Sequence, residues 1–311
     1  MMNFSLFDLH ADTPSELYRK KLSLQSNTLH VALDKAKDFH RYCQVMAVWS
    51  NCRLSDEEAW DHFWQIRENL LRELSDNRIP LLTDGASLQK ALSAEGRGAI
   101  LAVEDARILA GDLSRLDRLY EAGVRFLTLT WAGETCIGGS HDTDTPLTPF
   151  GRAVVERCFL LGITPDVSHA SRQVTKEVIA LAKAARRPLI ATHSNACSVW
   201  EHTRNLTDAE FKEITECGGI VGISLCPPHL AKDDCTVDTV VSHILHYLSL
   251  GGENTLCLGC DFDGIDTTPE GLTDLSQMPL LYDALLQKGI PESTVRKIFF
   301  ENAYGFAAAN I

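Results

Sequence analysis

The chain alternates eight short apolar runs with longer amphipathic stretches, and this alternation constrains its fold more than any other feature. Each run has the length and composition of a buried β-strand; the runs are residues 6–9, 44–49, 99–103, 125–130, 163–167, 188–192, 219–225 and 255–259. Strands that alternate with helices form parallel βαβ units. Eight such units in 311 residues predict an α/β fold with one closed (β/α)8 barrel of the TIM type. An open doubly wound sheet is the alternative, although the chain has no GxGxxG motif after its first strand to support a dinucleotide-binding version.

Helical patterns fill the stretches between and after these strands. Apolar residues recur there at three- and four-residue spacing, and the expected helices are residues 55–76, 150–161, 171–186, 208–217, 237–250, 275–288 and 292–306. Ser55 and Glu58 form a capping-box pattern at the start of the first helix. Glycines stand at expected helix C-caps, namely Gly123, Gly162, Gly218 and Gly289. No linker, repeat or low-complexity segment interrupts residues 1–311, which we expect to form a single domain.

Charge and composition argue against several classes of partner. The 29 Lys and Arg residues stand against 42 Asp and Glu residues, and this net charge of −13 would repel nucleic-acid phosphates and anionic lipid. No run approaches the ~18 apolar residues of a membrane span, and neither end resembles a signal peptide or a lipid-anchor signal. We therefore expect a cytoplasmic protein that binds neither nucleic acid nor membrane. Its ten cysteines are expected to be reduced thiols, including Cys257 and Cys260 in a strand core.

Five of the eight expected strands end in a histidine or a carboxylate. These residues are His10 with Asp12, Glu104, Asp166 with His169, His193, and Asp261 with Asp263. Because all strand ends of a parallel barrel meet at one rim, where barrel active sites lie, we expect these side chains to converge. The alternation of side chains along a strand does not decide between Asp166 and His169, or between Asp261 and Asp263.

The number of candidate ligands indicates the type of metal site. Imidazole and carboxylate groups are ligands for divalent metals, and a single catalytic zinc usually takes three from the protein. Five groups are present here, namely His10, Asp12, Glu104, His169 and His193. This set favours two divalent ions bridged by Glu104, with a hydroxide held between them that attacks a carbonyl.

The order of these motifs resembles the membrane (renal) dipeptidase family of zinc metallopeptidases, peptidase family M19, in its soluble bacterial form. The matching segments are residues 8–12 (DLHAD), Glu104, 127–130 (LTLT), 166–169 (DVSH), 193–196 (HSNA), 204–205 (RN) and 261–264 (DFDG). The resemblance implies a barrel of the metal-dependent hydrolase superfamily. It also implies a zinc-dependent dipeptidase that cleaves the peptide bond of small dipeptides, including L,D-dipeptides, and that forms a homodimer.

The resemblance further implies a role for each residue of the site. Two Zn²⁺ ions would be bound by His10 with Asp12 and by His169 with His193, and Glu104 would bridge the ions. Asp261 would take a proton from the attacking water and pass it to the leaving amine. Arg204 would clamp the free carboxylate of the dipeptide through its planar guanidinium.

One position departs from the family pattern and leaves the substrate range open. In the animal enzymes a histidine near the scissile carbonyl follows the LTLT segment, whereas this chain has Trp131 there. We expect Trp131 to form part of the substrate-pocket wall, with His141 as a candidate replacement donor. Two alternatives to a dipeptidase are a metal-dependent amidase for another small N-acyl amino acid and a non-catalytic metal-binding barrel.

Overall fold

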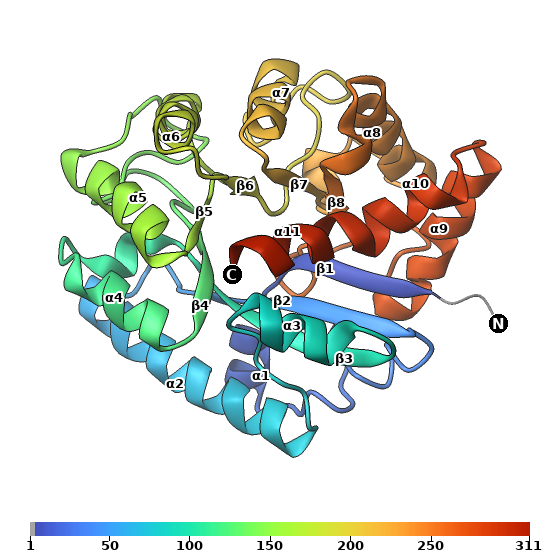
Figure 1. Cartoon of the computed structure of the whole chain (residues 1–311), viewed down its shortest axis with the longest axis horizontal. Helices are drawn as coiled ribbons and strands as arrows, with labels where there is room; N and C mark the ends of the chain where they lie inside the picture. Colours follow the sequence, from blue (N-terminus) through green and yellow to red (C-terminus); the bar gives the residue numbers. More distant parts are fainter. Residues whose placement is uncertain (1–3) are drawn as a thin grey trace.

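The computed structural model describes residues 4–311 and contains the closed parallel barrel that the sequence predicts (Figure 1). Its strands pair in chain order, and β8 pairs with β1 to close the barrel. The strands are β1 (Ser5–Ala11), β2 (Arg41–Trp49), β3 (Gly96–Glu104), β4 (Val124–Thr128), β5 (Thr164–Asp166), β6 (Ile190–Ala191), β7 (Ile220–Ile223) and β8 (Leu256–Leu258). Each expected apolar run overlaps one strand, so the predicted barrel is confirmed.

Helices follow the strands and surround the barrel (Figure 1). The expected helical stretches correspond to α2 (Asp56–Asp76), α5 (Pro149–Leu161), α6 (Arg172–Ala185), α7 (Asp208–Glu216), α8 (Val237–Ser249), α9 (Met278–Gln287), and α10 (Glu292–Arg296) continuing into α11 (Asn302–Asn310). Ser55 and Glu58 make the predicted capping box at α2. Gly162 ends α5 in the left-handed conformation, at φ 86°, as a C-cap glycine should.

The sequence pattern does not predict three helices, because they are short. They are α1 (Thr13–Lys20), α3 (Gly85–Leu92) and α4 (Ser114–Glu121), each of eight residues. Two turns of helix hold too few apolar positions to establish a 3.6-residue period. Of the three, α1 matters most for the site, because it starts directly after the metal-ligand candidate Asp12.

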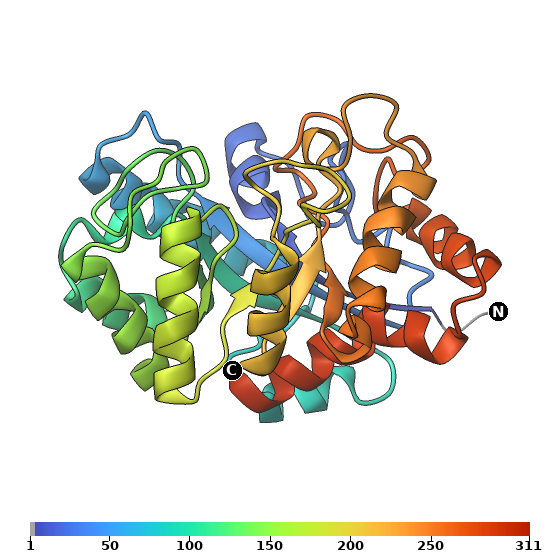
Figure 2. The ribbon, with the colours of Figure 1, turned by 90° about the horizontal axis from the view of Figure 1, so that it is seen from above.

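Buried apolar side chains pack the helices against the strands and close one end of the barrel. The smaller of two core clusters joins strand residues such as Phe7 and Phe126 to Phe306 of α11. Figure 2 shows α11 and α3 at one end of the barrel, with the long connecting loops at the other. Among the helices of residues 4–311, none combines the length and apolar character that a membrane crossing requires.

Two glycines allow strands β6 to β8 to approach closely beneath the site. A Cβ atom added to Gly259 would lie 1.7 Å from the carbonyl oxygen of Thr192, and one added to Gly222 would lie 2.0 Å from the same atom. Real side chains do not fit at such distances, so both positions require glycine. The backbone that carries Thr192 and the following His193 is therefore held tightly between its neighbours.

Candidate metal centre

A cavity of about 680 Å³ opens at the carboxyl ends of the strands, and it is lined by Asp12, Glu104, His169 and Asp261 among others. A larger cavity of about 1000 Å³ lies near the amino ends of the strands and is lined by residues such as Gly96. Within residues 4–311, every group of three or more side chains able to share a metal ion lies at the carboxyl end. Since barrel active sites lie at that end, the smaller cavity is the candidate site.

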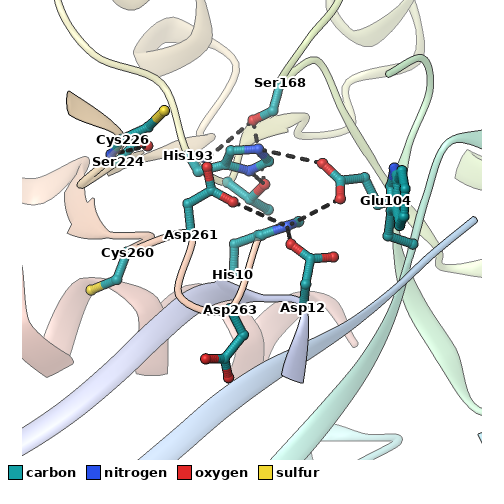
Figure 3. Close-up of polar contacts among 12 residues, drawn as sticks. His10, Asp12, Glu104, Ser168, His193, Ser224, Cys226, Cys260, Asp261 and Asp263 are labelled. Atoms are coloured by element: carbon teal, nitrogen blue, oxygen red, sulfur yellow. Dashed lines mark hydrogen bonds and ion pairs between the residues drawn. The ribbon is translucent and has the colours of Figure 1, made fainter. Parts of the chain in front are cut away.

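Glu104 lies between two groups of ligands, one at each of its carboxylate oxygens (Figure 3). Its Oε2 atom is 3.5 Å from Nε2 of His10, which is also 3.5 Å from Oδ2 of Asp12. Its Oε1 atom is 3.1 Å from Nε2 of His169 and 3.6 Å from Nε2 of His193. The structure thus brings together all five ligand candidates, with the two pairs that the family resemblance implies at different oxygens of Glu104.

Strand ends and two unusual backbone conformations bring these side chains together. Glu104 is the last residue of β3, and His10 lies near the end of β1. His169 and Asp261 lie beyond β5 and β8, where both adopt left-handed backbone conformations, at φ 68° and φ 61°. Such conformations are costly for residues other than glycine and cluster at functional sites. The backbone N–H of Asp261 donates to the carbonyl of His10 at 3.1 Å, which ties the end of β8 to β1.

Unpartnered polar atoms and excess carboxylates show that the donor set fits a divalent cation. Both ring nitrogens of His10 and Oδ1 of Asp12 are buried without a hydrogen-bond partner, and each such group costs about 1–3 kcal/mol. Burial and the neighbouring Asp12 carboxylate raise the pKa of Glu104 to about 8, while burial raises the pKa of Asp261 to about 7. A cation would supply the missing partners and favour the ionised carboxylates.

The histidines on the other side of Glu104 are neutral and therefore able to bind metal. Burial is the main cause that lowers the pKa of His169 and His193 well below the usual range. Their Nε2 atoms lie 2.9 Å apart, a distance that suits two nitrogens converging on one point. Neutral imidazole with carboxylate oxygen is a ligand set typical of zinc.

A buried carboxylate orients His193 through a hydroxyl group. Oγ1 of Thr192 donates to Oδ2 of Asp166 at 2.6 Å and lies 2.8 Å from Nδ1 of His193. Because the hydroxyl proton goes to Asp166, Nδ1 of His193 donates its proton to Thr192, and the lone pair of Nε2 remains free for a metal. Asp166 also accepts from Oγ1 of Thr128 and from the backbone N–H of Ser168. Asp166 therefore lies under the cluster as a support, whereas His169 lies within it.

The structure also distinguishes the two aspartates that follow β8. Asp261 points into the cluster, with Oδ1 4.0 Å from Nε2 of His10, while Asp263 turns away from it (Figure 3). Asp263 accepts hydrogen bonds from Oγ1 of Thr13 and from the backbone N–H of His30, both at 2.6 Å. Of the two aspartates, Asp261 is thus the one that faces the cluster.

Arg204 lies behind the metal-ligand cluster and is not one of the residues that line the cavity. Its guanidinium donates to the carbonyl of His193 and to Oγ of Ser194, both at 2.9 Å, while its buried Nε has no partner. His141 and His229 do line the cavity. Burial is the largest cause that lowers their pKa values, and the positive charge of Arg204 is the second largest. The positive charge of Arg204 therefore reaches the cavity at His141 and His229.

Trp131 and several loop residues complete the wall of the cavity. Trp131 lines it as expected and packs edge-on against Trp49, with ring centres 5.0 Å apart. The candidate donor His141 also lines it, with Nδ1 3.0 Å from Oγ1 of Thr203. Sequence reasoning missed other lining residues, among them His30, Cys226 and His229. His30 lies in a loop and His229 in a short 3-10 helix, so no strand-end pattern marks them, whereas Cys226 directly follows the expected strand 219–225.

The barrel and the cluster at its carboxyl end define the class of metal-dependent hydrolases. A sequence model of the membrane dipeptidase family, peptidase family M19, matches residues 1–305. The chain therefore belongs to this family of metallopeptidases, as the motifs had indicated.

Individual relatives agree with the family match. The chain is 32% identical to the uncharacterized dipeptidase C3A11.10c of Schizosaccharomyces pombe over 200 residues. This alignment covers 62% of this chain and 48% of that relative. The chain is 29% identical to dipeptidase 3 of Rattus norvegicus over an alignment of 325 residues. This alignment covers 97% of this chain and 64% of that relative. The chain thus spans about half to two thirds of these relatives. A metallopeptidase structure from Rhodobacter sphaeroides, liganded with a phosphinate mimic of L-Ala-D-Ala, is 26% identical with a TM-score of 0.90, covering 99% of this chain and 100% of that one.

The support of His193 by Thr192 leads to a testable prediction about metal affinity. Thr192→Val removes the hydroxyl while preserving side-chain shape, so His193 loses the partner of Nδ1. We expect zinc affinity to fall about 10–100-fold, as is typical when such a supporting partner is removed. Thr130→Val is the matched control, because the buried hydroxyl of Thr130 has no partner. Competition with a chromophoric chelator measures both variants, and a Thr192→Val affinity equal to that of wild type would contradict the role.

Proposed function

We propose that the protein is a zinc-dependent dipeptidase that hydrolyses the peptide bond of small dipeptides. The observation that carries this proposal is the position of Glu104, with one ligand group at each of its two oxygens. The adjoining cavity of about 680 Å³ lies within the usual range for small-molecule sites, ~300–1,000 Å³. Membership of the membrane dipeptidase family supports the choice of substrate.

Two ions suit this arrangement, because Glu104 forms one ligand group with His10 and Asp12 and another with His169 and His193, and a third group of His10, His193 and Asp261 lies between them. His10 with Asp12 would hold one Zn²⁺, and His169 with His193 would hold the other. Two such ions would supply an activated water or hydroxide and polarise the scissile carbonyl. A homodimer remains an expectation from the family resemblance.

Asp261 is suited to move the proton that hydrolysis requires. Its carboxylate lies at the cavity beside His10, and burial raises its pKa to about 7. With bound cations favouring its ionised form, this carboxylate would accept a proton from the attacking water and pass it to the leaving amine. The amine then departs in its uncharged form, and Asp261 returns to its starting state.

Arg204 would favour a dipeptide over a longer peptide through its charge, since its side chain lies behind the cavity wall. Its buried charge reaches the cavity at His141 and His229, and the Nε proton still lacks an acceptor. A free carboxylate bound there would fix the distance from the end of the substrate to the scissile carbonyl. A longer peptide has no carboxylate at this distance.

Metal analysis combined with a hydrolysis assay tests the proposed function directly. Protein purified without chelator and offered zinc should bind about two ions per chain and cleave L,L- or L,D-dipeptides. His193→Ala should lose both metal and activity, because it removes one ligand. His246→Ala, which changes a histidine at the surface of α8, should retain both. A wild-type protein that binds no zinc would rule out the metal centre.

Asp261→Asn separates proton transfer from metal binding. The amide cannot accept the proton, so we expect kcat to fall at least about 100-fold while the zinc content stays near that of wild type. Asp266→Asn is the control, since this exposed residue lines the cavity without joining the cluster. Near-normal turnover in Asp261→Asn would remove this residue from the mechanism.

Arg204→Lys tests the recognition of the free carboxylate. Lysine keeps the charge but loses the planar fork of donors, so kcat/KM for a free dipeptide should fall while metal content is unchanged. Wild type should strongly prefer a dipeptide over its carboxyl-amidated form, and the variant should prefer it less. Equal cleavage of both forms by wild type would instead favour a general amidase for small N-acyl compounds.

A further inference from the structure

The loop between α1 and β2, residues 21–40, brings His30 to the wall of the cavity. The side chain of His30 is 23% exposed, and its ring packs against Phe262 with ring centres 5.5 Å apart. The loop is held there by the buried carboxylate of Asp263, which accepts from the backbone N–H of His30. His30 has no part in the metal cluster or in the proposed proton transfer.

A second hydrogen bond determines which nitrogen of the His30 ring carries its proton. The backbone N–H of Asp263 donates to Nδ1 of His30 at 2.9 Å, so Nδ1 is an acceptor. In a neutral imidazole the proton then lies on Nε2. The ring is neutral, because burial and then the charge of Lys35 lower the pKa of His30 below its usual value. Within residues 4–311 the Nε2–H group makes no hydrogen bond and remains available to a molecule in the cavity.

His30 and Arg204 are held by different parts of the site, on different sides of Glu104. Its anchor Asp263 is bonded to Thr13 at the start of α1, directly after Asp12. Arg204, in contrast, is bonded to the backbone of His193 on the other side of Glu104. If the substrate carboxylate lies at the Arg204 end, its N-terminal residue extends towards His30.

The carboxylates near His30 already have partners, so an acceptor on a bound molecule is the best partner for its Nε2–H. On α1, both carboxylate oxygens of Glu16 are occupied, one by Arg19 and the other by Arg19 and Lys20 together. Lys35 pairs with Asp274 at 3.2 Å. Asp266 is exposed at the cavity mouth. The free donor of His30 therefore faces a surface where the nearest carboxylates on α1 and the loop are already paired.

We propose that His30 determines specificity for the N-terminal residue of the dipeptide, by donating its Nε2–H to an acceptor oxygen in that residue's side chain. The substrates this favours carry an amide or carboxylate, as in Asn or Asp, rather than an apolar group of the same size, as in Leu. A donor that the bound substrate removes from water without offering an acceptor penalises the apolar substrate. The inference rests on the proposed function, since it takes the substrate carboxylate to lie near Arg204.

Kinetics on four dipeptides test the proposal with the zinc-loaded enzyme. The substrates are Asn-Ala, Asp-Ala, Leu-Ala and Ala-Ala, and kcat/KM is measured for each. Wild type should prefer Asn-Ala or Asp-Ala over Leu-Ala, and the two polar substrates reveal whether amide or carboxylate is the better acceptor. His30→Ala should reduce this preference about tenfold while leaving Ala-Ala within about twofold of wild type.

Two further variants separate substrate contact from loop support. In His30→Asn, the side-chain oxygen can accept from the Asp263 N–H in place of Nδ1, but no group replaces Nε2–H. In His30→Gln, the terminal amide reaches the position of Nε2–H without the Nδ1 acceptor. We expect His30→Asn to lose the polar preference and His30→Gln to retain part of it. Melting temperatures of all three variants report on the loop itself.

The outcomes distinguish a failure of this inference from a failure of the proposed function. If wild type cleaves Ala-Ala but does not favour the polar substrates, the specificity role is wrong and the dipeptidase stands. If His30→Ala slows all four substrates equally and His30→Asn restores them, His30 supports the loop after β8 and contacts no substrate. If wild type cleaves none of the four, the proposed function fails and the inference falls with it.

Discussion

The carboxylate of Glu104, buried at the end of β3, is the interaction on which the rest of the site depends. Each of its oxygens faces a different set of ligands, and two other carboxylates, Asp12 and Asp261, share the same cavity. Three carboxylates in a largely buried space repel one another and lack the water that would solvate them. The arrangement becomes favourable only when cations balance the charge. The barrel contributes by holding these groups on separate strands that cannot move apart.

Much of the fold could be predicted from the sequence because its signals are local. Each strand is a short apolar run, and the long helices have enough turns to show an apolar face. The short helices α1, α3 and α4 could not be recognised in this way. The close approach at Gly259 was also invisible, because it depends on the carbonyl of Thr192, a residue distant in the chain.

The site was predictable where it follows strands and unpredictable where it follows loops. His10, Glu104 and His193 lie at or near strand ends, so the parallel barrel alone implies that they converge. Periodicity could not choose Asp261 over its neighbour Asp263, because the backbone beyond β8 is left-handed and the alternation of faces is lost there. His30 lies in a long loop whose path depends on contacts with Asp263, and no local pattern encodes such contacts.

The raised pKa of Glu104 also makes the stability of the metal-free folded state depend on pH. Without metal, the folded state keeps a proton on this carboxyl up to about pH 8, whereas a usual glutamate releases it near 4.5. The folded state then binds more protons than the unfolded chain, so stability falls as pH rises between these values. A bound cation removes this penalty and adds its own binding energy to folding. Metal scarcity in a cell would therefore shorten the lifetime of the protein itself, and its abundance would follow the metal supply.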